Sequence, residues 1–526
     1  METATTSGSL SAVLSQILGT DGYTDDTAAR NLMSQDIWSA GVTADFVASP
    51  SSIEQLRDTV AACHRHGIAL NPRGGGMSYT NSFTPDRAGI GILDLSRLNR
   101  IREINRLDMY VTAEAGVTWK QLYDALKPLG LRTPFWGPLS GLNSTIGGGL
   151  SQNNAFFGAG THGTTSESVT GLTVILADGT PVRTGTAATK IGKPFWRHYG
   201  PDLTGMFCGD SGALGFKAEI TFRLIPWPEH EAWASFEFSA RDACAQAMAA
   251  VAREGIACEV FGFDPALTRV RLKRASLAAD TKTLANVVRA QGNLLKGLQE
   301  GAKIALAGRS FMEADSWSLH VVVEGRSGSG VAEDMKRLKA ICARLGGAET
   351  ENSIPKIIRA NPFSTPNTIL GADGERWVPV HGIVSLSDGP KVWAALEDYF
   401  TSIAGEIERY QIQVGYLVTS LSTNGFLIEP VFLWPEETLA IHEAFVEPAH
   451  FRKLKRFPQN PDATAAVARA RRGVIDVFDA FGAAHFQIGR SYPYSEVLDE
   501  ASLTLLRSVK AALDPKGTVN PGVLGL

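Results

Sequence analysis

A glycine loop early in the chain could hold an anion. Three consecutive glycines stand in the segment Pro72-Arg73-Gly74-Gly75-Gly76-Met77-Ser78-Tyr79. Glycine reaches positive φ without strain, so successive N–H groups can point into one concavity and hold a pyrophosphate, and Ser78 can add a hydroxyl donor. The spacing matches neither the Rossmann fingerprint nor the P-loop. On this loop alone, a plain glycine turn after a strand is an equal alternative.

A second glycine-rich stretch runs from Gly137 to Gly163. It contains Thr145-Ile146-Gly147-Gly148-Gly149 and ends in Gly158-Ala159-Gly160-Thr161-His162-Gly163. So many glycines cost conformational entropy on folding, which makes the stretch hard to explain as filler. A ligand lying along this backbone explains the composition better than the alternative, a mobile surface loop.

Short helices and strands must position these two segments. A helix opens at Ser52 with Leu56, Val60 and Cys63 on its apolar face, and the strand Ile68-Ala69-Leu70 then leads into the first glycine loop. The pattern also predicts a helix over 118–129 and a hairpin turn at Asp178-Gly179. Further strands are predicted at 90–95, 109–114, 172–176, 182–184 and 216–224.

The pattern changes beyond the pair Pro226 and Pro228. Long alanine- and leucine-rich helices are predicted at 240–252, 284–306, 330–345 and 391–408, with β-rich runs at 319–323 and 426–432. The tail holds one more helix, through Leu505 and Leu513. The sequence therefore predicts a second α+β domain in which helices cover a sheet.

The composition is that of a globular protein with more than one domain. The chain has 526 residues, 44% of them hydrophobic and 20% charged, and its net charge of −4 gives no electrostatic reason to expect nucleic acid. No apolar run approaches the roughly 20 residues that span a bilayer, and Glu2 stands where a signal peptide would be basic, so we expect a soluble cytoplasmic protein. Five scattered cysteines indicate neither a metal site nor a disulfide framework.

Five segments, in order along the chain, resemble the vanillyl-alcohol-oxidase-like flavoproteins, which carry a PCMH-type FAD-binding domain. They are PRGGG at 72–76, TIGGGLSQNN at 145–154, SVTGLTVILADG at 168–179, FCGDSGALGF at 207–216 and LDPKGTVNPGVL at 513–524. Several ordered matches are far more specific than any one glycine motif, and the resemblance covers nearly the whole chain.

The resemblance implies an α+β fold with a two-subdomain PCMH-type FAD-binding domain and an α+β substrate (cap) domain built on a helix-covered antiparallel sheet. The implied FAD-binding domain covers 1–228, with its core at 42–228, and the cap covers 229–450. A C-terminal segment at 451–526 would return to the FAD domain and active site. Trp377-Val378-Pro379 and His381 lie in the order expected for the cap.

The resemblance also implies FAD as the cofactor. In that family the two glycine-rich segments hold the diphosphate and ribityl chain, the turn at 209–216 lies by the adenine, and the C-terminal segment returns to the flavin. Carried over residue by residue, the implied FAD contacts are Arg73, Gly74, Gly75, Gly76, Met77, Ser78, Pro138, Thr145, Gly147, Gly148, Asn153, Gly163, Gly212, Gly215 and Asn520.

Two departures from the family pattern bear on the chemistry. Members with covalently attached FAD often carry a histidine in the first glycine loop, where Met77 stands here, or in the cap, where no histidine occurs between His381 and His442. We therefore expect non-covalent FAD. Phenol oxidases of the family place a Tyr-Arg pair before a C-terminal histidine to hold phenolate, whereas Gly482-Ala483-Ala484 precedes His485 here.

The segment from His485 to Tyr494 holds a base, a fixed cation and two phenols. Flavin-linked oxidation needs a group that takes a proton from oxygen and a group that stabilises charge. We expect His485 to be the base and Arg490 the anion stabiliser, with Tyr492 and Tyr79 as further catalytic candidates. The alternatives are a structural histidine and packing of the tyrosines in the core. His162 and His381 are expected to make polar contacts to the cofactor or cap.

The leading hypothesis is an FAD-dependent oxidase or dehydrogenase that transfers a hydride from a small organic substrate to flavin N5. The aromatic-rich segment favours an aromatic or phenol-derived alcohol. A 2-hydroxy acid such as D-lactate or glycolate is the alternative, because Arg490 could hold a carboxylate. An NADPH-dependent reductase and a catalytically inactive flavin-binding protein are further alternatives. Oxygen or a redox protein would accept the electrons, and a homodimer is expected on general frequency.

Overall fold

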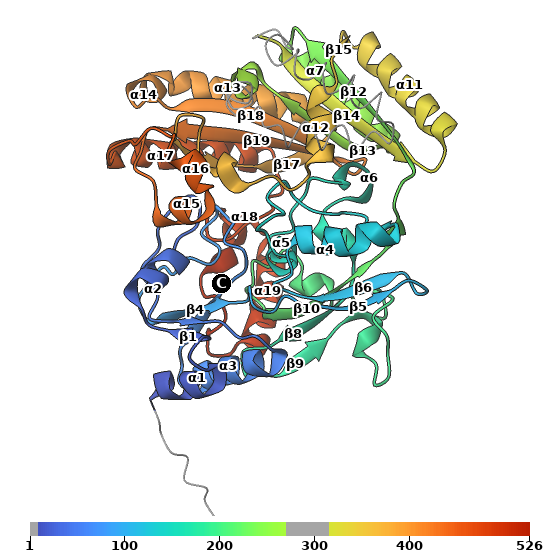
Figure 1. Ribbon diagram of the computed structural model, residues 1–526. Coiled ribbons are helices and arrows are strands. Elements are labelled where there is room, and N and C mark those ends of the chain that lie inside the picture. Colours follow the sequence, from blue (N-terminus) through green and yellow to red (C-terminus); the bar gives the residue numbers. More distant parts are fainter. Residues whose placement is uncertain (1–8, 270–314) are drawn as a thin grey trace, which may run out of the picture.

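The computed structural model describes residues 9–269 and 315–526, which form two α+β halves (Figure 1). The lower half in Figure 1 contains two sheets and both glycine-rich segments, and the upper half is built on one large sheet. The predicted α+β class is confirmed. The helix predicted at 284–306 lies outside the described residues.

A small sheet leads the chain into the first glycine loop. Its strand order is β1-β2-β4-β3, with β2, β4 and β3 parallel to one another. The bounds are β1 Tyr23–Thr24, β2 Val47–Ala48, β3 Ala69–Arg73 and β4 Ile90–Asp94, with helices α1 Leu10–Leu18, α2 Thr27–Met33 and α3 Ile53–Arg65. Helix α3 begins at the Ser52 cap and buries Leu56, Val60 and Cys63, as the sequence predicts. Strand β3 then delivers Arg73 to the start of the loop.

The second sheet has five antiparallel strands in the order β5-β6-β10-β8-β9. The bounds are β5 Ile101–Asn105, β6 Tyr110–Glu114, β8 Val169–Ile175, β9 Pro181–Arg183 and β10 Phe216–Arg223, and β7 Leu131–Arg132 pairs separately with β11 Ile225–Pro226. The predicted β8–β9 hairpin is confirmed. Helix α4 Trp119–Leu126 opens with a capping box between Thr118 and Gln121. The short helices α5 Ile146–Ser151 and α6 Ala159–His162 lie within the second glycine-rich stretch.

The upper half is built on an antiparallel sheet of eight strands. Its order is β15-β12-β14-β13-β18-β19-β16, and β17 also pairs with β19. The bounds are β12 His230–Phe238, β13 Ala257–Phe263, β14 Trp317–Gly325, β15 Ala348–Thr350, β16 Arg376–Pro379, β17 Gly382–Ser385, β18 Gln413–Leu421 and β19 Gly425–Trp434. Helices pack on this sheet, as predicted (Figure 1). They include α7 Arg241–Glu254, α11 Gly328–Arg344, α12 Ser353–Ala360, α13 Gly389–Ser402 and α17 Pro461–Ala480. The helix predicted at 391–408 is instead two helices, α13 and α14 Ala404–Arg409, separated at Ile403.

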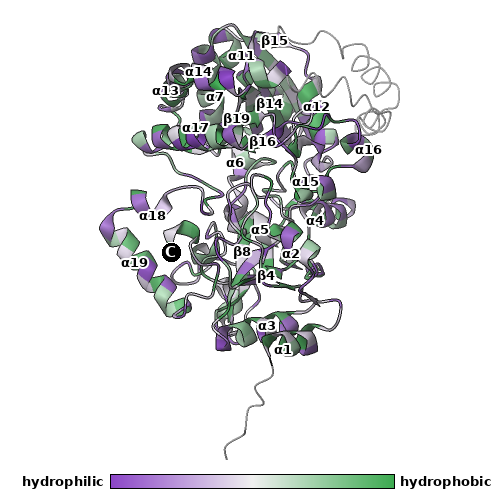
Figure 2. Ribbon diagram, turned by 90° about the vertical axis from the view of Figure 1, so that its left-hand side faces the viewer, coloured by the Kyte–Doolittle hydropathy of each residue, from purple (hydrophilic) through white to green (hydrophobic). Residues whose placement is uncertain are grey.

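The last part of the chain connects the two halves. After α15 Ala440–Phe445 and α16 Pro448–Phe451, helix α17 packs on β19 in the upper half. The chain then passes to the lower half, where α18 Tyr494–Val497 and α19 Glu500–Leu513 lie on one side (Figure 2). The tail ends against β3, because Leu70 N donates to Thr518 O and Asn520 N donates to Leu70 O. Within the described ranges, no helix is long and apolar enough to cross a membrane.

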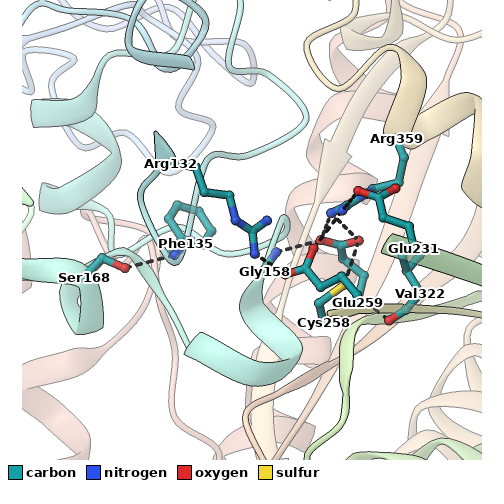
Figure 3. Close-up of polar contacts among 10 residues, drawn as sticks. Arg132, Phe135, Gly158, Ser168, Glu231, Cys258, Glu259, Val322 and Arg359 are labelled. Carbon is teal, nitrogen blue, oxygen red and sulfur yellow. Dashed lines mark hydrogen bonds and ion pairs between the residues drawn. The ribbon is translucent and has the colours of Figure 1, made fainter. Parts of the chain in front are cut away.

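Buried ion pairs join the two halves (Figure 3). We call Arg132, Glu231, Glu259, Glu324 and Arg359 the interdomain ion cluster. Arg132 at the end of β7 pairs with Glu324, and Arg359 of α12 pairs with all three glutamates. The cluster therefore fixes the upper sheet to the half that carries the glycine-rich segments.

Candidate functional site

The glycine loops and the C-terminal tail meet at one place in the lower half. A Cβ atom on Gly74 would overlap Thr145 Oγ1, and one on Gly75 would overlap Asn143 O. Gly212 has a φ of +75°, and a Cβ on it would lie 2.8 Å from Pro72 Cγ and 3.6 Å from Asn520 Nδ2. The structure thus brings together residues that the sequence predicts from four separate segments.

Strained backbone marks the same junction. Four non-glycine residues there have positive φ: Asn153 at 49°, Ser211 at 49°, Gln487 at 55° and Asn520 at 39°. Such conformations cost free energy and concentrate at functional sites, where surrounding contacts impose them. The strain supports the assignment of this junction as a ligand site.

Arg73 gives the junction an unpaired positive charge. Arg73 is 4% exposed, and its guanidinium lies 5.3 Å from the centre of the Phe83 ring. Its Nε has no hydrogen-bond partner among the described residues. Burial lowers the pKa of Arg73, and the nearby Asp94 opposes that effect. A buried guanidinium beside a glycine loop needs an anion, so these residues fit the diphosphate of FAD.

Not every predicted FAD contact is a free group. Gly147 packs 2.6 Å from Ala115 Cβ and Gly215 2.6 Å from Val174 Cγ1, measured from an added Cβ, so close packing alone explains both glycines. The side-chain oxygen of Asn153 accepts from Ser166 N, at 3.2 Å. The remaining predicted contacts lie in the junction loops or beside them: Gly76, Met77, Ser78, Pro138, Gly148 and Gly163.

Asn520 and Arg490 join the C-terminal segment to the loop after Tyr79. Asn520 Nδ2 donates to Ser82 O at 2.9 Å and to Ser211 O at 2.8 Å. Arg490 Nη1 donates to Asn81 O and Thr84 O, while its Nη2 donates to Asn520 Oδ1 and to Pro521 O. Since both Nη groups already have acceptors, the predicted role of Arg490 as anion stabiliser has no free Nη donor to use.

A cavity of about 730 Å³ is lined by the end of the second glycine-rich stretch and by strands of the upper sheet. Its lining includes Thr161 to Thr164 from one side and Ile383 to Ser385 of β17 from the other, with Arg223 and Ser422. Its volume is within the range of small-molecule sites. Burial lowers the pKa of His162, which lines this cavity, to about 4, so its imidazole is neutral.

A buried group of rings lies around His381, the residue that directly precedes β17: Tyr79, His381, Phe486 and Tyr492, which we call the Tyr79 cluster. The Tyr79 ring meets the edge of Trp377 with 5.5 Å between centres, and Gln487 Nε2 donates to its hydroxyl at 3.0 Å. His381 stacks on Phe486 with 4.0 Å between ring centres. The Tyr492 hydroxyl accepts from His381 N at 2.9 Å and lies 3.2 Å from His381 Nδ1.

His485 is placed differently from the expected base. Its Nδ1 lies 2.9 Å from His381 O and its Nε2 lies 3.1 Å from Asp479 Oδ1. Both partners are acceptors of the protein itself, so each ring nitrogen already faces an internal partner and neither is directed at a ligand. The ring also stacks on Tyr492 at 4.3 Å. The geometry therefore suits a residue that positions His381 and Tyr492.

His381 has the free nitrogen that His485 lacks. The residue is fully buried, and its Nε2 has no partner within the part of the chain that the structure describes. Burial, and then the nearby His485, hold the pKa of His381 well below its ordinary value, so the ring is neutral. Burial also raises the pKa of Tyr79 and of Tyr492, so both remain protonated phenols.

Sequence reasoning missed Arg471, a buried cation beside the Tyr79 cluster. Arg471 of α17 is 6% exposed, and its guanidinium lies 4.4 Å from the centre of the Trp38 ring. Its Nε and Nη2 have no acceptor among the described residues. The spacing Val467, Arg471, Val474 and Phe478 places this arginine on the apolar face of the helix, which is the pattern that could have identified it.

Two family models match the chain. The model of the FAD binding domain matches residues 44–185, and the model of the C-terminal domain of FAD linked oxidases matches residues 490–524. The first covers the first glycine loop and the second glycine-rich stretch, and the second covers Arg490, Tyr492 and Asn520. Both matches therefore fall on the segments that meet at the junction.

Known proteins resemble the chain in sequence and in fold. The glycolate oxidase subunit GlcD of Bacillus subtilis is 31% identical over 217 residues, which span 41% of this chain and only 44% of that relative. The mitochondrial D-lactate dehydrogenase [cytochrome] of Kluyveromyces lactis is 22% identical over 91% of this chain and 73% of that relative. The crystal structure of p-cresol methylhydroxylase with substrate bound has a TM-score of 0.73 at 18% identity and covers 98% of this chain and 96% of that chain.

The two matches show that the chain carries an FAD binding domain and the C-terminal domain of FAD linked oxidases, so it is an FAD-linked oxidoreductase. The chain shares the PCMH-type fold with p-cresol methylhydroxylase, so the resemblance read from its sequence is confirmed, as is FAD as the cofactor.

Proposed function

We propose that the chain oxidises a small hydroxy compound by hydride transfer to FAD, and that the Tyr79 cluster is where the hydroxyl group binds. The observation that carries the proposal is the position of His381. It is a neutral, buried imidazole whose Nε2 has no partner among the described residues, and it lies between β16 and β17 of the upper sheet beside the phenols of Tyr79 and Tyr492. Bound FAD would supply the hydride acceptor.

The side chains of the cluster have different roles in the proton transfer from the substrate hydroxyl. His381 Nε2 takes the proton of the substrate hydroxyl, while His381 Nδ1 donates to Tyr492 Oη. Tyr79 Oη accepts from Gln487, so its own proton is free to donate to the substrate oxygen. His485 holds the backbone of His381 from behind through its contact with His381 O.

We propose a 2-hydroxy acid as the substrate class, in preference to the aromatic alcohol that the sequence favours. The named activities of two relatives, a glycolate oxidase subunit and a D-lactate dehydrogenase, involve 2-hydroxy acids. The residues that precede His485 offer no Tyr-Arg pair for phenolate. The aromatic alternative keeps one specific support, which is the row of rings formed by Tyr79, Trp377 and Tyr492 around His381.

Anaerobic mixing of the holoprotein with candidate substrates tests this function. We expect D-lactate or glycolate to bleach the flavin and 4-hydroxybenzyl alcohol not to. Bleaching by 4-hydroxybenzyl alcohol alone would contradict the hydroxy-acid assignment. His381→Asn should slow bleaching by about 10²–10⁴-fold at unchanged FAD content. If instead His485→Gln slows bleaching by about 10²–10⁴-fold and His381→Asn leaves the rate unchanged, the base is His485 and the assignment of His381 is wrong.

We also propose that the FAD is not covalently attached. The first glycine loop carries Met77 in place of the histidine that family members with covalently attached FAD often have there. Acid precipitation of the holoprotein should leave the yellow colour in the supernatant. A yellow pellet would overturn this proposal and leave the substrate assignment untouched.

A further inference from the structure

We propose that Arg471 binds the carboxylate of the substrate through its Nε and Nη2 atoms. This inference rests on the proposed function and names the residue that selects the substrate class. These two nitrogens are the donors of Arg471 that are buried without an acceptor among the described residues. On a guanidinium, Nε and Nη2 point two N–H bonds in parallel to one side, which is the arrangement that takes a carboxylate in a bidentate manner.

Contacts of residues 36–39, which we call the N-terminal arm, place Arg471 next to the Tyr79 cluster. The guanidinium stacks on Trp38, and the preceding Ile37 N donates to Ser78 O at 3.1 Å, one residue before Tyr79. On the other side, Asn81 N donates to Asp36 Oδ2 at 2.8 Å. The arm is thus pinned along residues 78–81. The positive charge of Arg471 lowers the pKa of both Tyr79 and Tyr492, although burial dominates and raises each pKa.

The one carboxylate of this arm is already engaged. Asp36 is fully buried and accepts hydrogen bonds from the N–H groups of Trp38, Ser39 and Asn81 at 2.8–2.9 Å. Burial raises the pKa of Asp36 to about 6, while its three hydrogen bonds and the nearby charge of Arg471 lower it in part; the two side chains form no ion pair among those of the described residues. The guanidinium therefore keeps two donors that no internal anion uses, and a buried unpaired charge is costly unless a ligand pairs it.

The number of free donors distinguishes a carboxylate from a phenolate. Two parallel N–H groups match the two oxygens of a carboxylate, whereas a phenolate offers one oxygen and would leave one donor unsatisfied. In a 2-hydroxy acid the carboxylate is attached to the carbon that loses the hydride. Arg471 and His381 therefore serve adjacent groups of one small molecule.

The test uses oxalate, an anion that cannot be oxidised by hydride loss, and follows the flavin absorption spectrum of the holoprotein. Oxalate should perturb the spectrum of the wild type and protect the flavin against bleaching by D-lactate. Arg471→Met should weaken oxalate binding by about 100-fold or more, which is the loss expected for a charged bidentate contact. Arg471→Lys should weaken it less. Arg472→Met is the matched control, because Arg472 lies next on the same helix, is exposed and pairs with Asp476.

Each outcome bears on one proposal. Equal oxalate affinity of the Arg471→Met variant and the wild type would overturn the assignment of Arg471, even if the wild type oxidises 2-hydroxy acids. If the wild type binds oxalate through Arg471 but no 2-hydroxy acid bleaches the flavin, the proposed function fails and the anion site remains. A third result is that the wild type does not bind oxalate, but 4-hydroxybenzyl alcohol bleaches the flavin of the wild type and not that of Arg471→Met. Arg471 would then bind a phenolate, and the carboxylate assignment would be overturned.

Discussion

Arg359 and Arg471 are both buried arginines, yet their surroundings are opposite. Arg359, 4% exposed in its side chain, pairs with Glu231 and Glu259 (Figure 3). It also pairs with Glu324. Arg471, 6% exposed, has an aromatic ring on one face and two nitrogens without acceptors among the described residues. A charge that the fold itself neutralises serves the structure, whereas one that the fold leaves unpaired is available to a ligand.

The interdomain ion cluster also shows how the fold serves the cofactor site without touching it. Glu259 Oε1 accepts from Gly158 N at 2.8 Å, at the residue where the final glycine turns of the second stretch begin. Glu259 is held in turn by Arg359 Nη1, at 2.9 Å. A strand of the upper sheet thus fixes the backbone that leads to Gly163 and the cavity.

The comparison predicts opposite effects of the same substitution at the two arginines. Arg359→Met leaves three carboxylates around one remaining guanidinium and should lower the free energy of unfolding by about 3–5 kcal/mol. Arg471→Met removes an unpaired buried charge and should leave that free energy within about 1 kcal/mol of the wild type, or raise it. Urea midpoints of the substrate-free holoproteins, followed by circular dichroism, measure both. Equal losses would mean that Arg471 has a structural partner and would break the comparison.

Within the interdomain ion cluster, the glutamates should differ in a graded way. Glu324 pairs with both arginines, which together lower its pKa against the opposing effect of burial. Glu259 pairs with Arg359, and burial raises its pKa. Glu324→Gln should therefore cost about 3 kcal/mol of unfolding free energy and Glu259→Gln about 1 kcal/mol, because glutamine keeps an acceptor for Gly158 N. Urea midpoints that rank in the reverse order would contradict this account.

Much of the fold and of the FAD junction could be predicted from the sequence, because both depend on local chemistry. Helices α3 and α4 follow from caps and apolar spacing, and Gly74 and Gly75 are required where two loops approach too closely for a side chain. The small strands β1 and β2 were not predicted, since two residues form no periodic pattern. The break between α13 and α14 at Ile403 was also missed, since the helical pattern continues through it.

The catalytic side chains were harder to predict, because their roles depend on contacts between distant segments. His485 reads as a free base until the structure shows an acceptor at each nitrogen, and Arg490 reads as a free cation until its Nη groups are found bonded to carbonyls. The spacing of Val467, Arg471 and Val474 places Arg471 on an apolar helix face, but only the structure shows that Trp38, from the other end of the chain, lies against its guanidinium. No local pattern encodes which buried donors remain unsatisfied.

The stability of the segment that holds Trp38 against Arg471 should depend on pH through His442. His442 Nδ1 accepts from Leu439 N at 2.9 Å and its Nε2 donates to Ile37 O at 3.1 Å, so the neutral ring holds the arm that carries Trp38. Burial lowers the pKa of His442 from 6.5 to about 3. Between these two pKa values the unfolded chain takes up a proton at His442 that the native chain does not. The neutral His442 therefore contributes fully to stability above pH 6.5, and this contribution is lost as the pH falls from 6.5 towards about 3. The loss is about 1 kcal/mol between pH 6.5 and 5.5.

His442→Gln has no such titration, and other buried histidines such as His162 affect both proteins alike. The gap in urea midpoint between wild type and variant should therefore narrow as the pH falls. A constant gap would show that His442 is not kept neutral by the fold, and Trp38 would then need another anchor to hold its place under Arg471.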